Sequence, residues 1–142
     1  MSVFIDTGVF YAHHDTDATR HEAAVDGLER LFDGEFGVAY TSDYVVDEAI
    51  TLTRRRMGTF EDASTIADRI LGTGEYTSFV ECLYVDSDDL SAGVDAFRRD
   101  HDQELSFTDA VTIALCERRG IDAVLSFDDD FDGLVERVEP GY

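Results

Sequence analysis

The chain has 142 residues, 44% of them hydrophobic, which suits one ordinary domain with a core of its own, and it lacks the run of about 18 apolar residues that membrane spanning requires. Its 32 acidic residues face 11 basic residues, all arginine, and the net charge of −21 is far from that of most RNA-binding proteins. Such self-repulsion is screened at molar salt, where the screening length is about 3 Å, so we expect a halophilic, cytoplasmic protein.

The predicted elements alternate along the chain, with short apolar runs followed by segments of helical periodicity. This pattern is typical of an α/β domain with a largely parallel sheet, and it predicts one domain over residues 1–142. Strands are expected over 2–5, 38–41, 78–85, 123–127 and 134–138. Helices are expected over 8–14, 19–33, 42–58, 60–72, 88–101 and 107–120, the last four opened by Ser42, Thr59, Ser87 and Ser106.

Two aspartates stand at the carboxyl ends of predicted strands, where open α/β sheets bind their ligands. Asp6 directly follows "SVFI", and Asp128 directly follows "AVLSF". Asp6 has apolar sequence on both sides, so it is either a site residue or a cap of the helix that follows. Among the other acids after the second strand, Asp129 and Asp132 are expected to be solvated, and the role of Asp130 stays open.

Two further acids lie on predicted helices. At about 100° per residue, Glu48 falls on the edge of the apolar stripe of its helix, whereas Asp47 points nearly opposite, towards solvent. Asp109 lies in the first turn of a helix that is apolar almost all round, so its carboxylate is buried or faces a cleft. The alternatives are an edge glutamate paired with an arginine, and a capping box between Ser106 and Asp109.

These four acids make a candidate metal site. Carboxylates held close together repel one another, so such a cluster persists only around bound cations or by taking up protons. Oxygen-only ligands suit Mg²⁺ or Mn²⁺ rather than Zn²⁺. Two such ions about 4 Å apart would activate a water and steady the leaving oxygen during hydrolysis of a phosphodiester.

Four segments, "FIDTGVFYA", "DEAITLTRRR", "LSFTDAVTIAL" and "VLSFDDDF", resemble in order and spacing the PIN-domain nucleases, most closely their VapC-type toxin branch. The resemblance covers nearly the whole chain, including residues 15–24. It implies a single PIN-like domain with a five-stranded, largely parallel sheet, and an endoribonuclease that uses Mg²⁺ or Mn²⁺. It also implies a homodimer and a small antitoxin protein that covers the site. The catalytic and metal-binding acids that it implies are Asp6, Glu48, Asp109 and Asp128.

The chain departs from the family pattern at Gly8, where a Ser or Asn often stands two residues after the first aspartate, so a polar contact is missing there. Thr7 and Ser126 are kept as candidate hydroxyls beside the site. RNA binding normally relies on cations that neutralise phosphates. Arg55 lies seven residues after Glu48 on roughly the same helical face and is the first candidate for a phosphate contact. Ion pairs with surface acids are expected instead for Arg98, Arg99, Arg118 and Arg119.

The same residues argue against three other protein families. A haloacid-dehalogenase-like phosphatase needs a second aspartate where Gly8 stands, and receiver domains and P-loop NTPases both need a lysine, which this chain lacks. The alternatives that stay open are a non-catalytic PIN-like interaction domain and a housekeeping RNA-processing nuclease. The family resemblance favours hydrolysis of RNA that leaves a 3′-hydroxyl and a 5′-phosphate.

Overall fold

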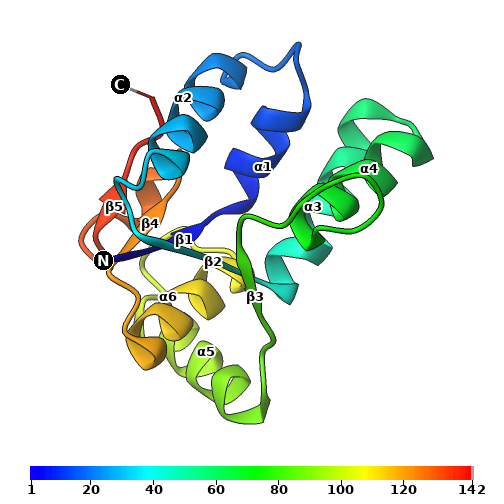
Figure 1. The fold of residues 1–142 in the computed structure, drawn as a ribbon. Coiled ribbons are helices and arrows are strands. Elements are labelled where there is room, and N and C mark those ends of the chain that lie inside the picture. The colour runs from blue at the N-terminus through cyan, green and yellow to red at the C-terminus, as the bar shows by residue number, and fades with distance from the viewer. Residues whose placement is uncertain (142) are drawn as a thin grey trace.

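The computed structural model describes residues 1–141 and shows helices packed around one central sheet (Figure 1). The strands are β1 (Ser2–Ile5), β2 (Val38–Ser42), β3 (Glu81–Leu83), β4 (Ala123–Leu125) and β5 (Arg137–Val138). The α-helices are α1 (Thr7–His14), α2 (His21–Phe32), α3 (Asp43–Met57), α4 (Phe60–Leu71), α5 (Ser87–Arg99) and α6 (Phe107–Arg119), and a short 3₁₀ turn covers Asp129–Phe131. The predicted α/β class is confirmed.

The sheet has five strands in the order β3-β2-β1-β4-β5, and all neighbouring pairs are parallel. β1 lies at the centre, with Phe4 opposite Tyr40 of β2 and opposite Val124 of β4. Because helices cover both faces, the central strands are apolar throughout, and Phe4 and Val124 are fully buried. The carboxyl ends of β1 and β4 therefore lie side by side at one edge of the sheet.

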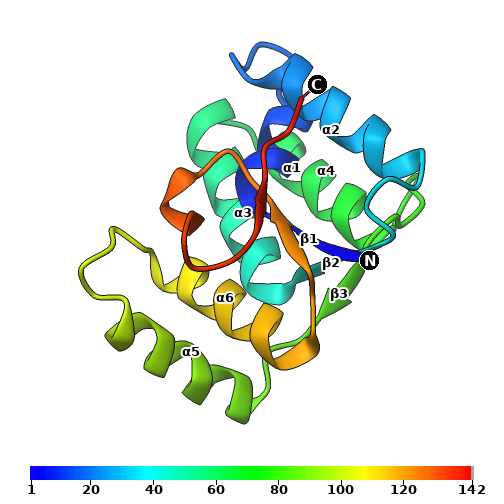
Figure 2. The ribbon, with the colours of Figure 1, turned by 90° about the vertical axis from the view of Figure 1, so that its left-hand side faces the viewer.

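The helices form two layers and an end group (Figures 1 and 2). α5 and α6 pack together on one side of the sheet, and α1 and α2 lie on the other. α3 and α4 stand beyond the end to which the strands run, where α3 also contacts α1 and α6. This arrangement brings parts of α1, α3 and α6 to the carboxyl edge of β1 and β4. No helix within residues 1–141 is long and apolar enough to cross a membrane.

Two expectations differ from the structure in detail. The strands expected over 78–85 and 134–138 form only at Glu81–Leu83 and Arg137–Val138, since they lie at the two edges of the sheet and pair on one side only. The cap of α5 is Asp86 rather than Ser87, which is the first helical residue. Asp86 accepts a bond from the amide of Asp89, whose carboxylate accepts one from the amide of Asp86, and this reciprocal pair outcompetes a lone serine.

Ion pairs hold the α5–α6 pair and involve three of the four arginines for which they were expected, Arg99, Arg118 and Arg119, whereas Arg98 forms none within residues 1–141. The partner of Arg118 and Arg119 is a buried acid and not a surface one. Asp89 of α5 is fully buried and accepts from Arg118 Nε at 3.0 Å and Arg119 Nη2 at 2.7 Å. Although burial opposes ionisation, the two guanidinium groups lower the pKa of Asp89 to about 2. At Gly93 the helices approach so closely that a Cβ would stand 2.8 Å from Val111 Cγ2. α6, which carries Asp109, is thus fixed firmly on its outer side.

Candidate active site

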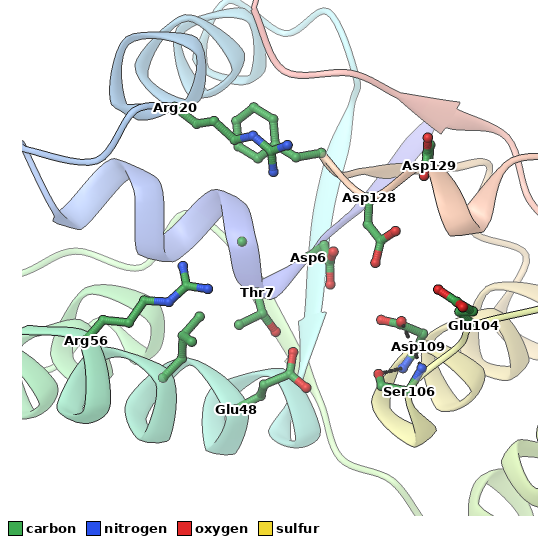
Figure 3. Close-up of a pocket in the computed structure, with 13 residues that line it drawn as sticks. Asp6, Thr7, Arg20, Glu48, Arg56, Glu104, Ser106, Asp109, Asp128 and Asp129 are labelled. Carbon is green, nitrogen blue, oxygen red and sulfur yellow. Dashed lines mark hydrogen bonds between the residues drawn. The ribbon is translucent and has the colours of Figure 1, made fainter.

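An open pocket of about 580 Å³ lies at the carboxyl edge of β1 and β4 (Figure 3). Four of its acids come from four different elements: one follows β1, one lies on α3, one on α6 and one follows β4. They are the four acids singled out from the sequence, Asp6, Glu48, Asp109 and Asp128. Glu104 and Asp129 also line the pocket; Asp129 is exposed to solvent, as expected, although it stands at the pocket rim.

Asp6 occupies the N-cap position of α1, but its side chain makes no capping bond to the helix. Its Oδ2 instead accepts a hydrogen bond of 2.6 Å from Ser126 Oγ, at the end of β4. Burial raises the pKa of Asp6 to about 6; the bond from Ser126 opposes the rise, and the nearby charges of Glu48 and Asp128 add to it. Asp6 is therefore a buried acid aimed into the pocket and not a helix cap.

Asp109 fulfils both interpretations that its sequence allowed. Its amide donates to Ser106 Oγ at 3.1 Å and its Oδ2 accepts from the amide of Ser106 at 3.2 Å, which completes a capping box at the start of α6. The same carboxylate lines the pocket. Burial, together with the charges of Asp6 and Asp128, raises the pKa of Asp109 to about 7, although the bonds with Ser106 oppose the rise. The pocket therefore holds acids that retain protons near neutral pH unless a cation compensates their charge.

Glu48 and Asp128 are half-buried at the pocket wall, whereas Asp47 is exposed, as the helical phase of α3 predicts. Asp128 Oδ1 accepts from the amide of Asp130 at 2.9 Å, which shapes the 3₁₀ turn after β4. Carboxylate oxygens of Asp128, Asp129 and Asp130 lie within 4.8 Å of one another. Asp130 itself is not part of the pocket lining, so it shapes the acidic turn from outside.

Both hydroxyl residues singled out from the sequence lie at the site. Ser126 is fully buried; its hydroxyl donates to Asp6 and accepts from the amide of Asp128 at 2.9 Å, so it joins two of the acids. Thr7 lines the pocket between Asp6 and Glu48 (Figure 3). Thr7 Oγ1 is buried and has no hydrogen-bond partner within residues 1–141. A buried hydroxyl without a hydrogen-bond partner costs free energy of folding, so this position suits a bound ligand or water that would form the bond.

The donor set fits a hard divalent cation. The four acids and Thr7 offer oxygen alone, as Mg²⁺ and Mn²⁺ prefer, and no histidine or cysteine lines this pocket. Burial, and to a smaller extent the neighbouring carboxylates, raise the pKa values of Asp6 and Asp109. A bound cation would compensate the negative charge of these carboxylates.

The cations at the pocket are Arg20 and Arg56, which the sequence interpretation missed (Figure 3). Arg55 does lie on the Glu48 face of α3, as its phase predicts, but it borders an adjoining pocket with Glu48 and Thr108. The acidic pocket opens towards α1, on the side where Arg56 projects. The choice between Arg55 and Arg56 depends on the tilt of α3 against α1, which the sequence does not give, and Arg20 stands in the turn before α2 and carries no periodic signal.

Gly8 sits beside the pocket with room to spare. A Cβ added there would meet only Phe127 Cδ2, at 3.9 Å, so the Ser or Asn common in the family would fit. The missing polar contact is thus a difference in side chain and not in backbone. It leaves the space between the acids and the two arginines open, since Gly8 borders both the acidic pocket and a second pocket next to it.

Comparisons with known proteins agree with this geometry. Residues 3–136 match the PIN domain family model. The 23S rRNA-specific endonuclease VapC20 of Mycobacterium tuberculosis is 29% identical over 136 residues, which cover 94% of this chain and 96% of that protein. Its crystal structure, described as that of a sarcin-ricin loop cleaving toxin, superposes with a TM-score of 0.79 at 31% identity, covering 97% of this chain and 99% of that one.

Two more distant relatives were found, one by sequence and one by fold. A VapC ribonuclease of Archaeoglobus fulgidus is 22% identical over 132 residues, covering 92% of this chain and 80% of that protein. VapBC2 of Rickettsia felis, crystallised on a fragment of promoter DNA, gives a TM-score of 0.71 at 10% identity, covering 97% of this chain and 98% of that one. The fold, the family match and the full-length similarity to VapC20 together mean that this chain belongs to the PIN domain family, in its VapC-type toxin branch.

Proposed function

We propose that this chain is a metal-dependent endoribonuclease that acts as the toxin of a toxin–antitoxin pair. The observation that carries the proposal is the convergence of Asp6, Glu48, Asp109 and Asp128 from four separate elements on one open pocket. In a chain of charge −21 most acids lie at the surface, and burying carboxylates next to one another costs free energy. A cluster that is buried nevertheless indicates a functional site. The similarity to VapC20 over nearly the whole chain supports the same conclusion.

The four carboxylates would hold Mg²⁺ or Mn²⁺, directly or through water. Such an ion supplies Lewis-acid stabilisation to phosphate oxygens and makes a bound water more acidic. The chain itself fixes the carboxylates before RNA arrives: Ser126 holds Asp6, and the amide of Ser106 holds Asp109. Because these bonds are already formed, little reorganisation remains to be done when the substrate binds.

The other residues singled out from the sequence have narrower proposed roles. Thr7 Oγ1 has its proton available for a water or a phosphate oxygen in the pocket. The hydroxyl of Ser126 is engaged by Asp6 and Asp128, so Ser126 is a positioning residue. Arg55, on the adjoining pocket beside Glu48, would contact a phosphate further along the bound strand. Hydrolysis would leave a 3′-hydroxyl and a 5′-phosphate, as in the family.

The first RNA to test is 23S rRNA, because VapC20 is a 23S rRNA-specific endonuclease and its structure is described as that of a sarcin-ricin loop cleaving toxin. The assay incubates the folded protein at molar KCl with ribosomal RNA and with a synthetic sarcin-ricin loop, adding Mg²⁺, Mn²⁺ or chelator. Sequencing of the product ends identifies the cleaved bond and its end groups. We expect one or a few cuts that require the metal.

The matched variants are Asp6→Asn and Asp95→Asn. Both remove one negative charge, but Asp6 lines the pocket, whereas Asp95 is exposed on α5. Cleavage that is lost in Asp6→Asn and kept in Asp95→Asn supports the proposal. Intact RNA in both metals, with protein shown to be folded, would contradict it and would favour the non-catalytic interaction domain. Cleavage that survives chelator would contradict the metal requirement.

Partners follow from the same assignment. We propose that a small antitoxin covers the pocket and that the chain forms a homodimer, with exposed apolar side chains such as Phe60, Tyr84 and Phe97 available for these contacts. Light scattering at molar KCl measures the oligomeric state of the chain alone. Adaptation to a salt-loaded cytoplasm is supported by the charge of −21 and the absence of lysine, and predicts that the fold loses stability in dilute buffer.

A further inference from the structure

A second pocket of about 370 Å³ adjoins the acidic one and shares Gly8, Arg20, Arg56 and Phe127 with it. Its volume falls within the range of small-ligand sites. The remaining lining comes from α1 and from the turn before α2, and includes Tyr11, Ala12, Asp17, Ala18 and Thr19. In Figure 3 the acids Asp109 and Glu104 lie on one side of the view and the two arginines on the other, with Asp6 and Thr7 between them.

Both arginines are held against aromatic rings. Arg20 Cζ lies 5.0 Å from the centroid of the Phe127 ring, and Arg56 Cζ lies 5.1 Å from that of Tyr11. Tyr11 is in turn fixed by its hydroxyl, which donates to Asp15. Stacking of this kind restricts the orientations that the guanidinium groups can take. Two cations are therefore pre-positioned at the boundary of the two pockets.

Ion pairing divides the arginines of this acidic chain into two groups. Arg99, Arg118, Arg119 and Arg137 each reach a carboxylate. Six others form no ion pair within residues 1–141, namely Arg20, Arg54, Arg55, Arg56, Arg69 and Arg98. Of these six, Arg20 and Arg56 are the two that line the acidic pocket. No carboxylate within residues 1–141 neutralises their charge, so it can serve an anion from outside the chain.

We propose that this second pocket is an RNA subsite, in which Arg20 and Arg56 bind a phosphate next to the scissile one and the adjoining nucleotide enters the space bordered by Phe127 and Tyr11. The inference rests on the proposed ribonuclease function. Guanidinium groups with a planar fork match phosphate oxygens, and a base can stack on the outer plane of a guanidinium group. Gly8 leaves the passage between the pockets open for the RNA strand. Stacked arginines also suit high salt, where diffuse attraction is screened but direct contacts persist.

The test measures binding and turnover separately. Binding uses a fluorescein-labelled single-stranded RNA and protein carrying Asp6→Asn with Mg²⁺ present, titrated over a range of KCl concentrations. The added variants are Arg20→Ala, Arg56→Ala and Arg20→Lys, with Arg98→Ala, an exposed arginine of α5, as the control. The three arginines changed are exposed, whereas Asp6 is buried, so thermal unfolding verifies that each protein is folded. Turnover uses the same arginine variants with Asp6 intact, on an RNA that the wild type cleaves.

Each Arg→Ala change removes one phosphate contact on a single strand. The slope of log affinity against log salt should become shallower by about 0.7, and affinity at about 0.1 M salt should fall about fivefold. KM should rise while kcat changes little, since the contact is made equally before and during the reaction. Arg20→Lys should recover the salt slope but not the full affinity, because lysine keeps the charge and loses the planar stack.

Three outcomes would overturn the subsite. If Arg20→Ala and Arg56→Ala bind and cleave like Arg98→Ala while the wild type cleaves RNA, the subsite is wrong and the proposed function stands. If an acidic peptide of matched charge displaces the RNA as well as unlabelled RNA does, the pocket recognises carboxylates and the nucleotide assignment is wrong. If the wild type neither binds nor cleaves RNA, the subsite falls together with the proposed function.

Discussion

Replacing Asp109 by asparagine should make the metal-free protein more stable above neutral pH, even though it removes a site residue. The pKa of Asp109 is raised from 3.8 to about 7, chiefly by burial. An acid whose folded-state pKa is raised contributes stability that is fully present below its unfolded value and is lost as pH rises through the folded value. The destabilisation by Asp109 therefore begins as pH rises above its unfolded pKa of 3.8 and is complete above about pH 7.

The magnitude follows from the same pKa values. A rise of about 3 units corresponds to about 4 kcal/mol, at about 1.4 kcal/mol per unit. This is the ceiling, since molar salt and coupling to Asp6 and Asp128 reduce it, and we expect a gain of about 1–3 kcal/mol. Asparagine can still accept the bond from the amide of Ser106, so the capping box survives the change. The gain corresponds to a rise in Tm of about 3–10 °C for a domain of this size.

The assay is thermal and chemical unfolding in molar KCl with chelator, over a pH series from below the unfolded pKa to above the folded one. The quantity of interest is the difference in free energy of unfolding between Asp109→Asn and wild type, with Asp95→Asn as the control for lost surface charge. The difference should grow as pH rises towards 7 and then level off. A variant no more stable than Asp95→Asn above neutral pH would refute the assignment of a strained, buried carboxylate.

The remaining predictions concern the metal, one hydroxyl and the helix pair. Mn²⁺ at about 100 times its Kd should stabilise the wild type by about 2.7 kcal/mol in calorimetry, and should stabilise Asp6→Asn much less. Equal stabilisation of both proteins would mean that the ion binds outside the acidic pocket. Ser126→Ala should lower the free energy of unfolding by about 1–3 kcal/mol. Because the change also raises the pKa of Asp6, the acidic limb of the pH–activity profile should move to higher pH. An unmoved limb would contradict the Ser126–Asp6 bond. Gly93→Ala should cost about 1–3 kcal/mol in urea unfolding, because its Cβ would meet Val111 Cγ2 at 2.8 Å; a neutral change would mean that α5 and α6 can separate without cost.

The sequence predicted those features that depend on local periodicity and on strand ends. β1 and β4 are short apolar runs that stop at an aspartate, and parallel strands bring such ends to one edge, so Asp6 and Asp128 could be placed together. Helical phase separated Glu48 from Asp47 for the same reason. Asp86 could have been recognised as the α5 cap from its spacing to Asp89, which repeats the pattern of a capping box.

The features that escaped prediction depend on how elements tilt against one another. Phase on α3 cannot say whether the pocket opens towards Arg55 or Arg56, because that depends on the approach of α1. Arg20 stands in an irregular turn, and its stacking on Phe127 joins residues far apart in the chain. The orphaned hydroxyl of Thr7 likewise becomes visible only when every neighbouring group has been placed.

The bonding of β1 to β4 has a consequence for synthesis. The amide of Asp6 donates to the carbonyl of Leu125 at 3.1 Å, and Ser126 then joins Asp6 to Asp128, so the first and last parts of the site are 120 residues apart in the chain. A nascent polypeptide that has not yet emerged beyond Asp128 lacks the strand that buries β1 and one of the four acids. The four acids therefore cannot come together until residue 128 has left the ribosome, so a shorter nascent chain has no complete site.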